Sequence, residues 1–102
     1  MSLLEGKVAV ITGGTRGIGL AIARAYARNG AAVMVASRTQ PAVDEAVRQI
    51  QAEGGQAAGL AVDVADLGQV QALAESARSR FGRLDIWVNN AGAAGPYGPT
   101  LG

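Results

Sequence analysis

A glycine-rich turn near the N-terminus is the first part of the sequence with the residue types and spacing to bind a ligand. Gly13, Gly17 and Gly19 separate the apolar segment 7–11 from a segment of helical periodicity that begins at Ile18. A strand that leads into a helix N-terminus offers unpaired backbone N–H groups and the positive end of the helix dipole, which together favour a phosphate group. Glycine permits the tight turn and the close approach of the backbone to the ligand. We predict a phosphate site here; the alternative is a turn that only connects two elements.

The glycine spacing and the end of the second apolar segment indicate which phosphate compound is bound. The spacing G-x-x-x-G-x-G lacks the lysine of nucleoside-triphosphate-hydrolysing loops, so a kinase or ATPase is not expected. In dinucleotide sites, an acid after the second strand selects NAD, whereas an arginine accommodates the 2′-phosphate of NADP. Ser37 and Arg38 stand there, no acid follows before Asp44, and Arg16 can lie on the same side. We therefore predict NADP(H) rather than NAD(H); the alternative is that Arg38 is a solvated loop residue.

Strand-like and helix-like segments alternate along the chain and would position these residues. Apolar segments at 7–11, 32–36, 57–62 and 84–88 predict strands. Between them lie three segments of helical spacing, the second beginning at Pro41 and the third at the N-cap Asp66, with Gln69 at capping-box distance. The expected apolar stripes are Ile18, Ile22, Ala25 and Tyr26; Val43, Ala46, Val47 and Ile50; and Val70, Leu73, Ala74, Ala77 and Phe81.

Strands that are apolar throughout, and separated by helices, are typical of a parallel sheet covered on both faces. We predict one α/β domain over residues 1–102, a doubly wound sheet of four strands in the order 3-2-1-4 with three helices. The glycine turn suggests that order, because the repetition alone does not fix it.

The composition excludes several classes of protein. The net charge of +1 gives no basic field for nucleic acid, and 49% hydrophobic residues with 17% charged residues are ordinary for a globular chain. The sequence has no cysteine and no histidine, which removes disulfides and the commonest metal ligands. No apolar stretch approaches the roughly 20 residues that span a bilayer, and no signal peptide is evident. We expect a cytoplasmic protein with no membrane or nucleic-acid partner.

Three motifs in order resemble the short-chain dehydrogenase/reductase superfamily. They are LEGKVAVITGGTRGIG at 4–19, Asp63 and Val64 after the third strand, and Asn89, Asn90, Ala91 and Gly92 after the fourth. The subclass with TGxxxGxG and NNAG, which includes the 3-oxoacyl-[acyl-carrier-protein] reductases, is the most similar. The resemblance covers essentially the whole chain and implies a Rossmann-type fold. It implies a homo-oligomer as well, and a small carbonyl or alcohol as the substrate of a full-length form.

The resemblance also assigns roles to residues that match the motifs. It places Asp63 on the adenine amino group, Val64 on the adenine ring, and Ser37 and Arg38 at the ribose 2′-phosphate. The turn residues would line the pyrophosphate and the adenosine ribose. Asn90, Ala91 and Gly92 would line the nicotinamide ribose. The full predicted cofactor site is Gly13, Thr15, Arg16, Gly17, Ile18, Gly19, Ser37, Arg38, Asp63, Val64, Asn90, Ala91 and Gly92. For Asp63 the alternative is a loop acid that caps the next helix, and for Asn90 it is turn formation.

The catalytic half of the family pattern is missing from these residues. Family catalysis needs a tyrosine, a lysine four residues later and a serine. Tyr26 is followed four residues on by Gly30, Tyr97 by Leu101, and the only lysine is Lys7. We therefore expect this chain alone to be inactive, with no catalytic residue in it.

Two hypotheses remain about the chain as a whole. The first is the N-terminal cofactor-binding half of an NADP-dependent oxidoreductase that interconverts carbonyls and alcohols by hydride transfer. The second is a non-catalytic nucleotide-binding or regulatory module that is complete at 102 residues. The family order also predicts that the first two helices share one face of the sheet and the third covers the other. Segment 84–88 would then be an open edge, and we expect Trp87 to be in the core.

Overall fold

The structure, a computed structural model, describes residues 3–90, so Ala91 and Gly92 of the predicted site lie outside the described residues. Strands and helices alternate strictly along the chain, as the apolar segments predicted. The elements are β1 (Val8–Thr12), α1 (Gly17–Arg28), β2 (Ala32–Ser37), α2 (Gln40–Ala52), β3 (Gln56–Ala61), α3 (Leu67–Phe81) and β4 (Ile86–Asn89).

The four strands form one parallel sheet in the order β3-β2-β1-β4, which confirms the predicted doubly wound topology. In the register, Thr12 at the end of β1 lies beside Ala36 of β2 on one side and Asn89 of β4 on the other. The carboxyl ends of the strands therefore meet along one edge of the sheet. Ligands of open α/β sheets bind in the crevice outside these ends.

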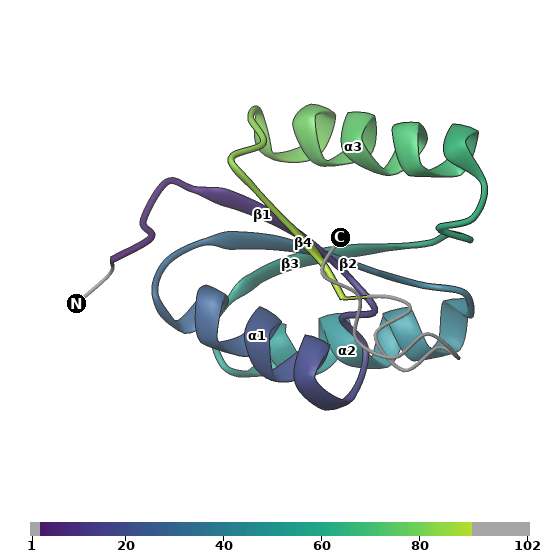
Figure 1. Ribbon diagram of the computed structural model, residues 1–102. Helices are drawn as coiled ribbons and strands as arrows, with labels where there is room; N and C mark the ends of the chain where they lie inside the picture. Colours follow the sequence, from purple (N-terminus) through teal and green to yellow (C-terminus); the bar gives the residue numbers. More distant parts are fainter. Residues whose placement is uncertain (1–2, 91–102) are drawn as a thin grey trace.

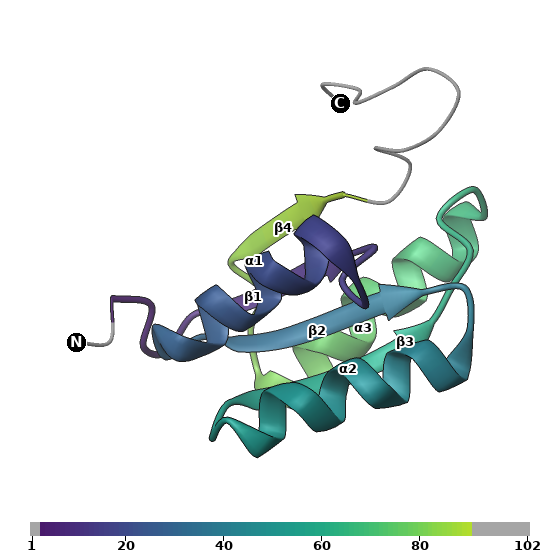
Figure 2. The same cartoon turned by 90° about the horizontal axis from the view of Figure 1, so that it is seen from below.

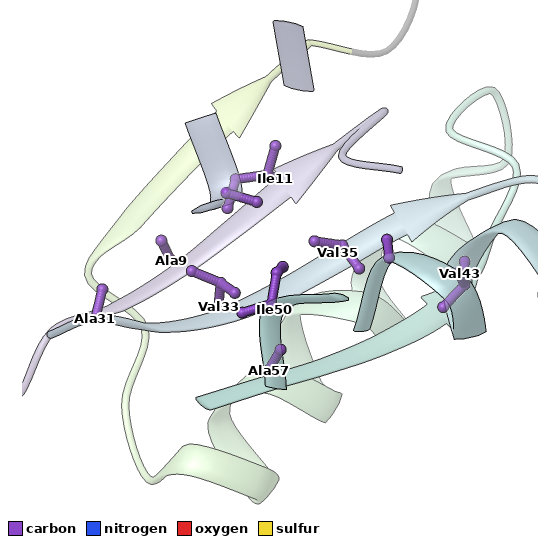
Figure 3. Packing of buried hydrophobic residues seen from close by; sticks show 10 residues of the cluster. Ala9, Ile11, Ala31, Val33, Val35, Val43, Ile50 and Ala57 are labelled. Carbon is purple, nitrogen blue, oxygen red and sulfur yellow. The ribbon is translucent and has the colours of Figure 1, made fainter. Parts of the chain in front are cut away.

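The helices form a layer on each face of the sheet, as predicted. Figure 1 shows α1 and α2 below the sheet and α3 above it. The larger core cluster lies between the sheet and the α1–α2 layer and includes Ile11, Val33, Val35, Val43 and Ile50. All five are labelled in Figure 3, along the strands and α2. A second cluster packs α3 on the opposite face. Both faces of the central strands are shielded from solvent, which explains why β1 and β2 are apolar at nearly every position.

Strand β4 is less buried than the other strands. Within residues 3–90 it pairs only with β1, and Figure 2 shows it at the outer margin of the sheet. Its side chains alternate between half-buried and exposed, whereas every residue of β1 is buried. The predicted open edge is therefore present in the described part of the chain.

The structure contradicts the predicted core at three residues. Ile18 is 73% exposed and Trp87 is 38% exposed, and Ala25 also lies on the solvent side of α1. The buried residues of α1 are instead Gly19 and Ala23, because this helix approaches the sheet through its smallest side chains. Trp87 is exposed because it lies on the edge strand β4. The apolar stripes predicted for α2 and α3 are buried or half-buried as expected.

Candidate functional site

A cavity of about 610 Å³ opens at the carboxyl ends of β1, β2 and β3. Three segments that are distant in the sequence line it: the glycine turn after β1, the end of β2 with the start of α2, and the loop after β3. The lining residues are Gly13, Thr15, Arg16, Ala36, Ser37, Arg38, Thr39, Ala42, Val62, Asp63, Val64 and Ala65. The structure thus brings seven of the predicted site residues to one cavity.

The glycine turn exposes the start of α1 to the cavity. Gly13 has φ +66°, a backbone conformation that side chains disfavour, and its N–H donates to the carbonyl of Ala36 at 2.8 Å. Arg16 is the N-cap residue of α1, in an extended conformation and without a side-chain hydrogen bond to the helix. The first-turn N–H groups of α1 therefore have no side-chain cap in the described residues. This arrangement suits an anion.

Gly19 is the point of closest approach within the turn. A Cβ atom at this position would lie 2.0 Å from the carbonyl oxygen of Gly13 and 2.7 Å from Nδ2 of Asn90. No side chain fits in that space, so the glycine is required for the helix to lie against the turn. Gly17 and Ile18 belong to the same turn but do not line the cavity, and Ile18 is exposed.

Two guanidinium groups lie at the same cavity. Arg16 contributes one from the turn and Arg38 the other from the end of β2, and both residues are exposed. Within residues 3–90 neither forms an ion pair, whereas Arg24 and Arg28 pair with Glu53 and Arg48 pairs with Glu45. The hydroxyl of Ser37 accepts the N–H of Thr39 at 3.4 Å, which curls the chain around this end of β2. The cavity is therefore lined by two arginines that have no ion-pair partner within residues 3–90.

The loop after β3 forms the opposite wall. Oδ1 of Asp63 accepts the N–H of Ala65 at 2.9 Å, while Oδ2 and the N–H of Val64 have no hydrogen-bond partner in the part of the chain that the structure describes. An acceptor and a donor on neighbouring residues are complementary to the donor–acceptor edge of a purine base. Asp66, not Asp63, caps α3, as the sequence predicted.

Asn90 lies at the other end of the glycine turn, away from the cavity. Its Nδ2 donates to the carbonyl of Gly13 at 3.3 Å, and its N–H donates to Oγ1 of Thr12 at 3.0 Å. The hydroxyl of the buried Thr12 also lies 3.1 Å from Oδ1 of Asn89. These contacts tie the end of β4 to the turn after β1, so Asn90 braces the turn rather than lining the cavity.

Shifted pKa values among the described residues belong to ion pairs outside the cavity. The hydrogen bond from Arg24 lowers the pKa of Glu53, and hydrogen bonds from Arg83 and from the backbone of Val8 lower that of Asp85. No group of three His, Cys, Asp or Glu side chains in residues 3–90 could hold a metal ion. Among the described residues, the groups that the cavity offers to a ligand are therefore arginine side chains, a carboxylate oxygen and backbone N–H groups.

Sequence reasoning missed some residues around the cavity. Thr39 and Ala42 also line it, and their place within four residues after the predicted Arg38 is the only signal that could have identified them. Thr12, which is buried and braces the turn, could have been recognised as a hydroxyl residue at the end of an otherwise apolar strand. Gln69 was predicted only as part of a helix cap.

A Rossmann-type sheet with a glycine turn at its carboxyl edge is the architecture of many nucleotide-binding α/β proteins, and comparison with known proteins identifies the family. The family model for short chain dehydrogenases matches residues 7–100. The chain therefore belongs to the short chain dehydrogenase family.

Similar proteins include dehydrogenases and reductases of several kinds. The chain is 44% identical to the D-threitol dehydrogenase of Mycolicibacterium smegmatis, over 89% of this chain and 35% of the relative. It is 44% identical to the 7alpha-hydroxysteroid dehydrogenase of Escherichia coli, over 91% of this chain and 36% of the relative. The structure of L-sorbose reductase from Gluconobacter frateurii, complexed with NADPH and L-sorbose, matches with a TM-score of 0.84 and 47% identity, over 90% of this chain and 36% of that one.

The chain spans about a third of the length of these curated relatives. Two of the neighbouring structures contain nicotinamide dinucleotides: NADPH in the sorbose reductase and NADH in a 7α-hydroxysteroid dehydrogenase. The latter matches at 42% identity with a TM-score of 0.82, over 84% of this chain and 34% of that one. None of the helices in residues 3–90 is long and apolar enough to cross a membrane.

Proposed function

We propose that this chain is the cofactor-binding part of an NADP(H)-dependent oxidoreductase that interconverts carbonyls and alcohols. The main support for NADP(H) is a pair of arginines, Arg16 and Arg38, that line the same cavity. Neither has an ion-pair partner in the described residues. The relatives named as dehydrogenases and reductases support an oxidoreductase over a purely regulatory module.

The cavity fits the adenosine half of the cofactor. Arg38 and Ser37 are proposed to hold the 2′-phosphate together with Arg16, since a phosphate dianion is best matched by guanidinium groups. No carboxylate follows β2 to hydrogen-bond a free 2′-hydroxyl, because the next acid is Asp44 on α2. At the opposite wall, Oδ2 of Asp63 and the N–H of Val64 are proposed to meet the adenine edge.

The glycine turn fits the pyrophosphate. The open N-terminus of α1 supplies backbone N–H groups, and Gly19 lets the first turn of α1 lie directly against the glycine turn. Thr15, Gly17 and Ile18 are proposed to line this part of the site, with Asn90, Ala91 and Gly92 toward the nicotinamide ribose. Once bound, the cofactor supplies the hydride; the residues of this chain bind and orient it.

The remaining features of the function depend on residues outside this chain. The proposed substrate is a small carbonyl compound or alcohol, and the proton-transferring tyrosine with its lysine and serine is absent from the 102 residues, so we propose that this chain alone does not turn over. Residues 1–102 are thus proposed to be an incomplete NAD(P)-binding domain. We also propose that the protein forms a homo-oligomer and is located in the cytoplasm.

The cofactor proposal is tested by the substitution Arg38→Asp. Calorimetric titration of the wild-type chain should show tighter binding of NADPH than of NADH. The substitution removes a charge-assisted hydrogen bond worth about 1.5–3 kcal/mol and should weaken NADPH by about 10- to 100-fold. Because aspartate can bond a free 2′-hydroxyl, NADH should then bind as well as NADPH or better.

Arg78→Asp is the matched control, since it makes the same change of charge on an exposed residue of α3 that does not line the cavity. Its binding of both cofactors should equal that of the wild type at moderate salt. Equal affinity of the wild type for NADPH and NADH, unchanged by Arg38→Asp, would overturn the assignment of NADP(H).

A further inference from the structure

We infer that Gln69 positions the cavity wall formed by the loop after β3, which carries Asp63 and Val64, by holding the backbone of Asp63. Gln69 lies in the first turn of α3 and does not itself line the cavity. The inference rests on the proposed function, because it concerns how the same site binds the adenosine half of a dinucleotide. It assigns Gln69 as a positioning residue that acts through Asp63 and Val64.

The loop after β3 needs such support because its strand is at the edge of the sheet. Within the described residues β3 pairs only with β2, and the last bond along this edge runs from the N–H of Val62 to the carbonyl of Ser37 at 2.8 Å. From Asp63 onward no neighbouring strand holds the chain. The N–H of Asp63 is instead bound by a side chain, Oε1 of Gln69, at 2.8 Å.

Gln69 is held in turn by the residue that caps its helix. Its Nε2 donates to Oδ2 of Asp66 at 3.2 Å, and its backbone N–H donates to Oδ1 of Asp66 at 3.2 Å. The N–H of Asp66 donates to the carbonyl of Asp63 at 2.9 Å, which closes a ring of hydrogen bonds from Asp63 to Asp66 to Gln69 and back. In an ordinary capping box the side chain at this position would bond the N-cap N–H itself. Here it reaches three residues further, into the wall of the cavity.

The ring fixes the groups that face a ligand. With the N–H of Asp63 held and its Oδ1 engaged by Ala65, the direction of the carboxylate is set and Oδ2 is left as the acceptor. The next peptide carries the N–H of Val64, so a rotation at Asp63 would displace both groups together. Loss of the hydrogen bond between Gln69 and Asp63 should therefore weaken the binding of a purine, although Gln69 does not contact the purine itself.

The test compares two variants whose side chains at position 69 are of nearly equal length. Gln69→Met removes the acceptor, whereas the double variant Gln69→Glu/Asp66→Asn keeps an oxygen for the N–H of Asp63 and exchanges donor and acceptor between the two side chains at unchanged net charge. We expect Gln69→Met to weaken NADPH and adenosine 2′,5′-bisphosphate alike, by about three- to tenfold, the worth of one hydrogen bond. Gln69→Glu/Asp66→Asn should stay within about twofold of the wild type for both compounds. Gln71→Met is the control, since Gln71 is exposed on the same helix and has no hydrogen-bonded side chain in the described part.

Hydrogen exchange at the amide of Asp63 gives a readout that does not depend on ligand. It should be faster in Gln69→Met than in the wild type, Gln69→Glu/Asp66→Asn or Gln71→Met. The inference is overturned if Gln69→Met binds adenosine 2′,5′-bisphosphate as the wild type does, or if its Asp63 amide remains equally protected. If the wild type binds neither NADPH nor NADH, the proposed function fails instead, while the amide exchange still decides whether Gln69 holds the loop.

Discussion

Gly19 and Thr12 set the geometry of the glycine turn from opposite sides. Gly19 lets the first turn of α1 lie against the carbonyl of Gly13, and Thr12 ties the end of β1 to Asn90 after β4. Neither residue lines the cavity, yet each fixes where the backbone N–H groups of the turn are placed. The positions of the ligand-facing groups therefore depend on residues behind them.

Gly19→Ala should be among the most disruptive small substitutions in the chain. The new methyl group would lie 2.0 Å from a backbone oxygen, which cannot move aside as a flexible side chain would. We expect a loss of about 1–3 kcal/mol in the free energy of unfolding and loss of dinucleotide binding. Urea denaturation and calorimetric titration with NADPH measure the two effects.

Gly68→Ala provides the comparison, because Gly68 is also helical but its nearest neighbour would be the side-chain Oδ1 of Asp66 at 3.3 Å. Alanine is favoured over glycine in helices, so stability should be equal or slightly higher. Equal stability of the Gly19 and Gly68 variants would contradict the steric account of the turn.

At the scale of elements, α3 is the sole cover of its face of the sheet in the described residues. It is anchored mainly by Leu73 and Ala77, both fully buried, against Val10 and Met34. The helices α1 and α2 share the other face and a larger cluster. The attachment of α3, and with it the loop that carries Asp63, therefore depends on few large side chains.

Leu73→Ala should consequently lower the free energy of unfolding by about 2–5 kcal/mol, since it opens a cavity under α3. Thermal and urea denaturation followed by circular dichroism measure the loss. Leu67→Ala makes the same change on the same helix at a side chain that is 71% exposed, and it should stay within about 0.5 kcal/mol of the wild type. Equal losses for both variants would contradict the assigned orientation of α3.

The element order and the parallel topology could be predicted from the sequence, because apolar strands, helical stripes and the glycine turn all agree. The environments of Ile18 and Trp87 could not. Helix α1 meets the sheet through Gly19 and Ala23, and periodicity favours large apolar side chains over small ones as the buried face. Trp87 lies on a strand that pairs on one side only in residues 3–90. This pairing is a property of the assembled sheet and cannot be predicted from the local sequence pattern.

The candidate site was predictable to a similar degree. Motif spacing placed the turn, Ser37 and Arg38, and Asp63 and Val64 at one crevice, where the structure brings them together. The brace through Thr12 and the ring through Gln69 join residues by side-chain hydrogen bonds across separate elements. Such bonds depend on distances in the folded molecule, which is why the sequence did not reveal them.

At the scale of the whole molecule, Asp85 fastens the amino-terminal ends of β1 and β4. Its Oδ2 accepts the N–H of Val8 at 2.8 Å and its Oδ1 accepts Nη2 of Arg83 at 2.7 Å. The bond from Arg83, followed by that from Val8, lowers the pKa of Asp85 below its ordinary value of 3.8. The folded state therefore favours the ionised carboxylate more than the unfolded state does.

Asp85→Asn should for this reason have a pH-dependent effect. Above the ordinary pKa the wild type should have a higher melting temperature than the variant, because its carboxylate is ionised and paired. As the pH falls through the lowered pKa of the folded state, protonation removes this contribution and the two melting curves should converge. Melting temperatures between pH 7 and pH 2.5 test it.

Glu75→Gln is the control, an exposed carboxylate of α3 without a hydrogen bond in the described residues. Its difference from the wild type should remain small across the same range of pH. A constant difference between Asp85→Asn and the wild type at every pH would contradict the electrostatic explanation.

The position of β1 between β2 and β4 has a consequence for synthesis on the ribosome. The bonds that join β1 to β4, such as that between Thr12 and Asn89, span 77 residues of sequence. A nascent chain can pair β1 with β2 early, but the second side of β1 stays bare until Asn90 has emerged. Since contacts distant in sequence form slowly, the apolar residues of β1 are exposed longest although they are synthesised first. The strand that is most buried at the end is thus the one for which a chaperone has the longest opportunity to bind.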